Sequence, residues 1–149
     1  MAEVEITWTD GYRFVATDST KHSVVMSSTG DGRGMKPSDL LLVALGGCVA
    51  VDVVGILEKK RQKVTGISIR VTGEQDNEPP WAFRRIHQAF VIRGRNLSVP
   101  AITQAIELSI KKYCSVHATV SGVAEVTSDF EIIEEGASEP VTETLSLAR

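Results

Sequence analysis

An apolar run of eighteen residues, Leu40–Leu57, constrains the fold of this chain more than any other segment. Its length is close to the roughly 20 residues that a membrane-spanning helix needs. However, the run contains Asp52 and three glycines, and it has no Trp or Tyr at either end, whereas membrane helices carry aromatic residues at their interfaces. We therefore predict a buried helix over residues 37–61, with Pro37 in its first turn and a basic segment at its end. No membrane partner is expected.

Segments rich in β-branched residues and alternating in polarity predict strands on both sides of this helix. The predicted strands cover residues 4–8, 12–17, 22–28, 64–74, 84–94 and 123–133. A second helix is predicted over residues 98–114, with Ser98 as its cap and Pro100 in its first turn. The order βββ-α-ββ-α-β predicts an α+β protein in which helices pack on antiparallel sheets.

The size and composition of the chain fit one globular domain. Its 149 residues are 42% hydrophobic, enough for a core of its own. We assign the domain to residues 1–133 and a polar, mostly acidic tail to residues 134–149. The net charge of -3 offers no basic surface for nucleic acid. The first residues lack the pattern of a signal peptide, so a cytoplasmic location is expected.

The glycine-rich segment TGDGRG at residues 29–34 raises the question of phosphate binding. It lacks the GK[ST] ending of a P-loop and the G-x-G-x-x-G spacing of a dinucleotide fold, so we interpret it as a flexible connector. The sequence gives an equally weak indication of a metal site. His22, His87 and His117 are scattered, and no C-x-x-C or H-E-x-x-H motif occurs. Neither a cofactor nor a metal is expected.

The chain has two cysteines, Cys48 and Cys114. A structural disulfide does not persist in the cytoplasm, so the thiols are inert core residues, metal ligands or redox groups. Cys48 lies eleven residues beyond Pro37, about 16 Å along the helix and out of reach of its dipole. Asp52 disfavours a thiolate there, so activation needs a cation from elsewhere, and Arg13 is the best candidate. The alternative is that Cys48 is only a small buried hydrophobic residue.

The neighbours of the two cysteines differ. Gly46 and Gly47 precede Cys48, and each costs a helix about 1 kcal/mol relative to alanine. We therefore expect another backbone or a substrate to approach closely at this point. Cys114 follows two lysines at a predicted helix end, where a thiol can be accessible. A half-buried structural cysteine is the alternative there.

The segments GMKPSDLLLVALGGCVAVDVVGILEKKR and AIELSIKKYCSVHATV resemble the OsmC/Ohr superfamily, the osmotically inducible and organic hydroperoxide resistance proteins. The likeness extends over about residues 4–133 and is greatest to the OsmC-like branch with ALGGC and KYCSV segments. It implies an intertwined homodimer, with the long apolar helices at its centre and the active sites at the subunit interface.

The resemblance also implies a chemistry. The peroxidase members use the cysteine of the central helix to attack a hydroperoxide, and a later cysteine resolves the sulfenic acid as a disulfide. Cys48 and Cys114 match these positions. Arg13 matches the arginine that holds the thiolate, and Asp39, one residue beyond the position of the family's glutamate, is the acid expected to pair with it. An external thiol or dithiol would then reduce the disulfide.

Two other functions are compatible with the sequence. A binding protein without peroxidase activity would use the apolar cleft of the dimer for a small ligand, with Cys48 in its lining. A thiol hydrolase or acyltransferase would pair one of the cysteines with His117 as a base. Peroxide-dependent loss of both thiols separates the peroxidase from these alternatives.

Overall fold

The computed structural model describes residues 1–136, so most of the predicted tail lies outside the described residues. The chain folds into two compact units, and the boundary between them lies between Leu41 and Leu42. Helix α1 (Pro37–Lys59) runs across this boundary. The assignment of residues 1–133 to one domain stays a prediction.

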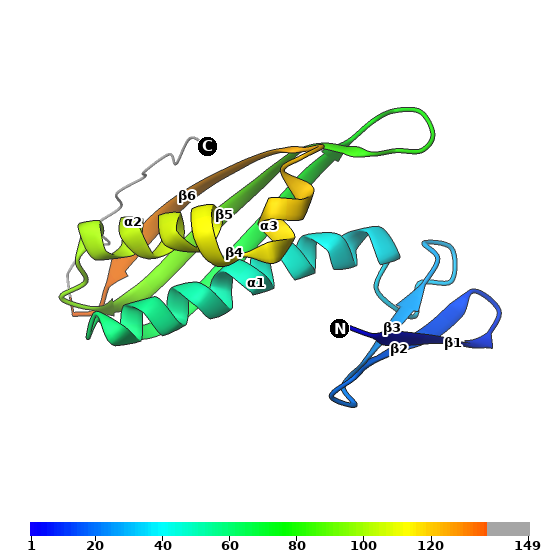
Figure 1. Ribbon diagram of the computed structural model, residues 1–149, viewed down its shortest axis with the longest axis horizontal. Helices are drawn as coiled ribbons and strands as arrows, with labels where there is room; N and C mark the ends of the chain where they lie inside the picture. The colour runs from blue at the N-terminus through cyan, green and yellow to red at the C-terminus, as the bar shows by residue number, and fades with distance from the viewer. Residues whose placement is uncertain (137–149) are drawn as a thin grey trace. The chain divides into compact units, whose positions relative to one another are not determined.

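The first unit contains a three-stranded antiparallel sheet of β1 (Val4–Asp10), β2 (Arg13–Asp18) and β3 (Ser23–Ser27), in that order (Figure 1). Gly11, with a φ of 49°, allows the tight turn between β1 and β2. All of β1 is exposed, including Val4, Ile6 and Trp8. This meander confirms the three strands predicted before the long helix.

The loop after β3 is folded by its own hydrogen bonds. The amide groups of Asp31 and Gly32 donate to the carbonyl of Ser28, and Gly34 donates to the hydroxyl of Ser27. A side chain at Gly34 would place its Cβ 2.7 Å from the backbone of Met26, so this position requires glycine. Gly34 therefore serves chain packing, and the segment that was predicted to be a flexible connector is a hydrogen-bonded loop between β3 and α1.

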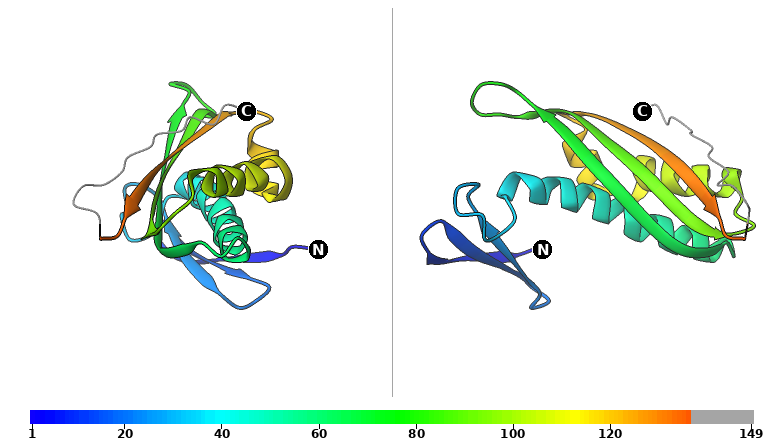
Figure 2. Two further views of the ribbon diagram at one scale, coloured as in Figure 1. Left: turned by 90° about the vertical axis from the view of Figure 1, so that its left-hand side faces the viewer. Right: turned by 180° about the vertical axis from the view of Figure 1, so that it is seen from behind.

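The second unit is a three-stranded sheet with helices on one face (Figure 2). Its elements are α1, β4 (Lys63–Gln75), β5 (Phe83–Arg95), α2 (Val99–Leu108), the π-helix η1 (Ser109–Tyr113), α3 (Ser115–Val120) and β6 (Glu125–Glu134). Strands β4 and β5 form the predicted hairpin. The α+β class is confirmed.

Two details correct the prediction. The second sheet is mixed, because β6 pairs with β5 in parallel rather than antiparallel. The helices between β5 and β6 return the chain to the end of the sheet where β5 begins. Strand β6 therefore runs in the same direction as β5. The helix predicted over residues 98–114 is in fact α2 followed by η1, and a further helix, α3, precedes β6. The helical pattern does not distinguish the wider turn of a π-helix from an α-helical turn.

The core of the second unit lies between α1, α2 and the sheet. Val49, Val53 and Leu57 of α1 pack in one buried cluster with Phe90 of β5 and Phe130 of β6. Helix α1 is long and apolar enough to span a membrane by length and composition alone, a test that core helices of soluble proteins also pass. Its packing on the sheet fits the predicted core helix.

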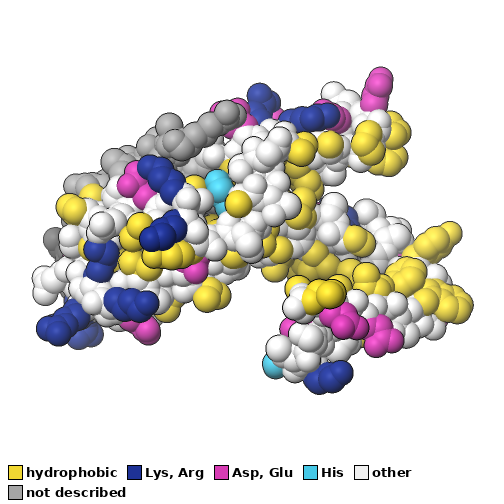
Figure 3. Space-filling model, in the orientation of Figure 1, with side chains coloured by type: hydrophobic (Ala, Val, Ile, Leu, Met, Phe, Trp, Pro, Cys, Tyr) yellow, Lys and Arg dark blue, Asp and Glu magenta, His cyan; other side chains and the backbone are white. Residues whose placement is uncertain are grey.

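One face of α1 packs on this core and another is exposed. Val51 has 75% of its surface accessible, and Val43 and Val54 are exposed as well. Figure 3 shows hydrophobic side chains at the surface along α1 and on the N-terminal sheet. The apolar composition of α1 therefore exceeds what the packing of a single chain requires.

Candidate functional site

Cys48 lies in the middle of α1, half-buried beside the hydrophobic core. The glycines before it behave differently from each other. A Cβ on Gly46 would lie 2.7 Å from Cγ2 of Val71 on β4, whereas a Cβ on Gly47 would meet no atom within 4 Å. A close approach thus exists at Gly46, but a side chain of the sheet makes it, and not the backbone or substrate that was predicted.

Cys114 lies at the junction of η1 and α3 and is only 3% exposed. Its amide group donates to the carbonyl of Ser109, five residues earlier, over 2.9 Å. Its backbone is extended, with a φ of -75° and a ψ of 102°. Its Sγ accepts a hydrogen bond of 3.2 Å from the amide group of His117. The accessible thiol expected at a helix end is therefore buried, because the chain turns into α3 and the thiol becomes its cap.

The two thiols are in contact. Burial, and then a side-chain hydrogen bond with Cys48, raise the pKa of Cys114 to about 11, although the amide groups of His117 and Val116 act in the opposite direction. The S–H group of Cys114 is therefore retained at neutral pH and donates to the sulfur of Cys48. This arrangement distinguishes the two groups chemically: Cys114 is a proton donor and Cys48 is the acceptor.

A polar contact joins the helices next to this pair. The hydroxyl of Ser109 donates to Oδ2 of Asp52 over 2.7 Å. Asp52 stands out in the sequence as an isolated carboxylate in an apolar helix, and such a group needs a partner. Sequence reasoning missed Ser109, because a serine in an amphipathic helix gives no signal of its own. Its full burial is visible only in the fold.

Within the described residues, the ring of His117 makes no hydrogen bond to either thiol. Burial lowers the pKa of His117, so its ring is neutral at pH 7. Nδ1 of the ring is buried and has no hydrogen-bond partner within the described residues. The contact between this residue and Cys114 comes from its backbone amide group.

Arg13 lies on β2 of the first unit and is partly buried. Its guanidinium lies 3.5 Å from Oδ1 of Asp10 and 3.8 Å from Oδ2 of Asp31. Nε of Arg13 and Oδ2 of Asp31 are both buried without a hydrogen-bond partner in residues 1–136. Asp39 forms its ion pair with Lys36, over 3.3 Å. Asp31 therefore faces the predicted cation from the loop before α1, a role that its place in a glycine-rich segment does not indicate.

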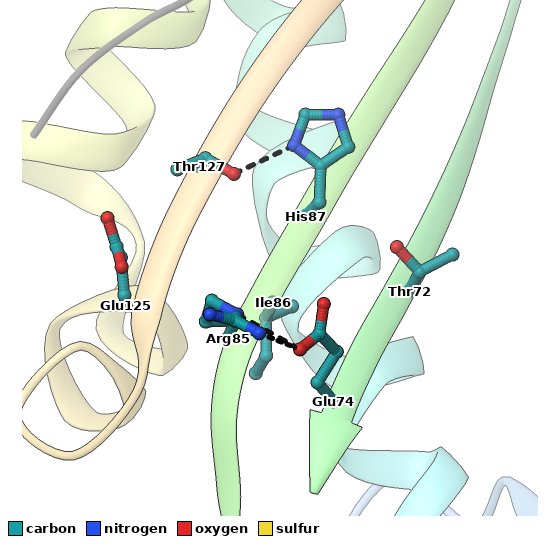
Figure 4. A pocket seen from close by; sticks show the side chains of 7 residues that line it. All are labelled: Thr72, Glu74, Arg85, Ile86, His87, Glu125 and Thr127. Atoms are coloured by element: carbon teal, nitrogen blue, oxygen red, sulfur yellow. Dashed lines mark hydrogen bonds and ion pairs between the residues drawn. The ribbon is translucent and has the colours of Figure 1, made fainter.

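A separate hollow of about 200 Å³ lies on the second sheet, among residues of β4, β5 and β6 (Figure 4). It is lined by Thr72, Glu74, Arg85, Ile86, His87, Glu125 and Thr127. Arg85 pairs with Glu74. Nδ1 of His87 lies 2.8 Å from Oγ1 of Thr127, and Nε2 lies 3.2 Å from Asp129. These groups largely satisfy one another, and neither thiol lines the hollow. Across residues 1–136, no cluster of three or more His, Cys, Asp or Glu side chains could hold a metal.

Comparisons with known proteins identify relatives along most of the chain. Residues 30–129 match the family described as OsmC-like protein. Protein YhfA of Escherichia coli (strain K12) is 32% identical over 131 residues, which are 88% of this chain and 98% of YhfA. The crystal structure of a hypothetical protein from Aquifex aeolicus VF5 has a TM-score of 0.82 at 32% identity and covers 91% of this chain and 98% of its own.

A more distant structure shares the fold. The organic hydroperoxide resistance protein OhrB of Bacillus subtilis has a TM-score of 0.59 at 14% identity. The likeness covers 88% of this chain and 98% of OhrB.

Proposed function

Because the chain belongs to the OsmC-like protein family, we propose that it is a cysteine-based peroxidase that reduces organic hydroperoxides in defence against oxidative stress. The family match also confirms the resemblance predicted from the sequence. The observation that carries the proposal is that the free thiols of Cys114 and Cys48 lie beside each other at the same apolar cluster. A related fold in a protein named for organic hydroperoxide resistance supports it.

The reaction has two chemical steps at these sulfurs. The thiolate of Cys48 attacks one oxygen of the hydroperoxide, the O–O bond breaks, and the other oxygen leaves as an alcohol after taking up a proton. Cys48 is thereby oxidised to a sulfenic acid. The sulfur of Cys114 then attacks the sulfenic sulfur, an S–S bond forms, and the thiol proton leaves with the hydroxyl group as water.

The environments of the two thiols suit these different roles. Cys114 keeps its proton at neutral pH and so carries the proton that the departing hydroxyl group requires. Cys48 packs beside apolar side chains, an environment that favours hydroperoxides with organic substituents. An external thiol or dithiol then reduces the disulfide by supplying two electrons and two protons.

We assign the activating cation to Arg13. Its Nε is buried and has no hydrogen-bond partner within the described residues, so the guanidinium keeps an unused donor. Asp31, 3.8 Å from that nitrogen, would hold the guanidinium in place. In the structure, Asp39 forms its ion pair with Lys36. Its pairing with Arg13 stays a prediction.

The working form in this proposal is a homodimer. The exposed apolar side chains of α1 support it, because an uncovered face of this kind is typical of an interaction surface. A second copy would bring its own α1 against this face and complete the surroundings of Cys48.

The experiment that tests the activity is intact mass measurement with thiol counting. One equivalent of tert-butyl hydroperoxide should remove both thiols of the wild-type chain and lower its mass by two hydrogen atoms, with release of one tert-butanol. Unchanged mass and two remaining thiols would contradict the peroxidase and favour a binding protein. A stable mass increase without disulfide formation would contradict the resolving step.

A further inference from the structure

Ser109 makes hydrogen bonds to the backbone of Cys114 and to the helix that carries Cys48. Its carbonyl accepts from the amide group of Cys114 over 2.9 Å, and its hydroxyl donates to Oδ2 of Asp52 over 2.7 Å. Asp52 follows Cys48 by one turn of α1. Ser109 thus links the backbone that carries one thiol to the helix that carries the other.

These contacts close a ring. Helix α1 fixes Cys48 and Asp52 relative to each other, and Asp52 accepts a hydrogen bond from Ser109. Ser109 in turn accepts one from the amide group of Cys114. The free thiol of Cys114 lies beside that of Cys48, which packs against the same apolar cluster. The hydrogen bond between Asp52 and Ser109 is therefore a polar contact between the two segments that carry the sulfurs.

The local structure is unusual in two ways. A carboxylate in a strongly apolar helix is costly unless it is hydrogen-bonded. A π-helical turn is rare, and such turns occur frequently at functional sites. Ser109 begins η1 and is fully buried. Its carbonyl accepts from the amide group of Cys114, five residues later, so this turn ends at the residue that carries the second thiol.

We propose that Asp52 and Ser109 are a positioning pair that holds the thiol of Cys114 within bonding reach of Cys48. The inference rests on the proposed function and adds a determinant of its resolving step. Disulfide geometry tolerates little displacement of the two backbones, and a shift of about 1 Å can slow a reaction between fixed groups about 100-fold. Tight positioning makes disulfide formation faster than further oxidation of the sulfenic acid.

The test is a redox equilibrium with glutathione, which requires no peroxide. Glutathione disulfide oxidises the two protein thiols to a disulfide and is itself reduced to two molecules of glutathione, so the equilibrium gives the effective concentration of one thiol at the other. Asp52→Ala and Ser109→Ala should each lower this concentration at least tenfold. The double variant should lose no more than either single variant, because both remove the same contact.

Two further variants separate positioning from general stability. Asp52→Asn keeps an oxygen that accepts from the hydroxyl of Ser109, so it should stay within threefold of the wild type. Ser128→Ala is the matched control, since Ser128 is a buried serine that accepts a hydrogen bond from Gln88 on the second sheet. It should lower the melting temperature without changing the effective concentration.

The results overturn the inference in either of two cases. One is an effective concentration that changes less than threefold in Ser109→Ala, with circular dichroism showing that this variant is folded. The other is a Ser128→Ala control whose effective concentration falls as much as that of Ser109→Ala. A wild type that forms the disulfide with glutathione but consumes no hydroperoxide contradicts the proposed function and leaves the positioning result intact. A wild type that forms no disulfide contradicts both.

Discussion

At the residue scale, the two cysteines differ because their surroundings differ. Cys114 is buried and keeps its proton beside Cys48, while amide groups at the start of α3 partly offset the effect of burial on its pKa. The sequence places lysines next to Cys114, yet Lys111 and Lys112 are exposed. The state of this thiol is therefore governed by burial and hydrogen bonding.

The first prediction concerns the pH dependence of Cys114. Its pKa of about 11 predicts that alkylation by iodoacetamide rises about tenfold per pH unit from pH 7 to pH 10, because the thiolate is the nucleophile. The folded pKa exceeds that of an unfolded thiol, about 8.5. Its contribution to stability is therefore fully present below about pH 8.5 and is lost as the pH rises toward 11.

Peptide mapping of the alkylated wild type measures the rate at Cys114 separately from that at Cys48. Protein unfolded in guanidinium is the control, and its rate should level off near pH 9. The same plateau in the folded protein would contradict the buried, protonated thiol.

The second prediction concerns Arg13. If its guanidinium stabilises the thiolate of Cys48, Arg13→Ala should slow peroxide consumption about tenfold or more, equivalent to about 1.4 kcal/mol. Alkylation of Cys48 below pH 8 should slow in parallel. Arg33→Ala, which removes an exposed arginine from the loop before α1, is the control and should retain the wild-type rates. Equal rates in both variants would exclude Arg13 as the cation.

At the element scale, α1 shows how one helix serves packing and chemistry together. Gly46, two residues before Cys48, lets the helix lie against Val71 of β4. Asp52, one turn farther along, is bonded to η1. The carboxylate within the apolar run and the closely packed glycine before Cys48 thus give this helix its contacts with η1 and with β4.

The third prediction compares the two adjacent glycines. Gly46→Ala should destabilise the fold by about 1–3 kcal/mol, because the added methyl group overlaps the stiff side chain of Val71. Gly47→Ala meets open space in the chain and should raise helix stability by up to about 1 kcal/mol. Urea unfolding of the two variants measures the difference. A larger loss of stability at Gly47 would contradict the packing of α1 on the sheet.

At the scale of the whole molecule, the sequence predicts most elements but not all of their connections. Alternation in polarity located the strands, and the apolar run located α1. The parallel pairing of β6 depends on where the helical connection returns the chain, which periodicity does not encode. The prediction that Cys48 and Cys114 meet came from the family resemblance. The roles of Ser109 and Asp31 depend on burial and distance across elements, and no local pattern reveals them.

The fourth prediction concerns assembly. We expect a homodimer with an interface larger than about 2,000 Å², the size typical of obligate dimers. Val51→Glu should shift the protein toward monomer, because Val51 is the most exposed apolar side chain of α1. Val123→Glu, which adds the same charge at an exposed valine outside α1, should stay dimeric. Light scattering at micromolar concentration measures both, and a monomeric wild type would contradict the dimer.

The most direct test of the central claim, that Cys48 attacks and Cys114 resolves, is dimedone trapping in single-cysteine variants. Cys114→Ser should carry out one turnover with tert-butyl hydroperoxide and leave Cys48 as a sulfenic acid, so dimedone labels the peptide that contains Cys48. Excess peroxide should convert that group to sulfinic acid, and Cys48→Ser should consume no peroxide. Wild-type consumption by Cys48→Ser, or label on Cys114 alone, would contradict the account.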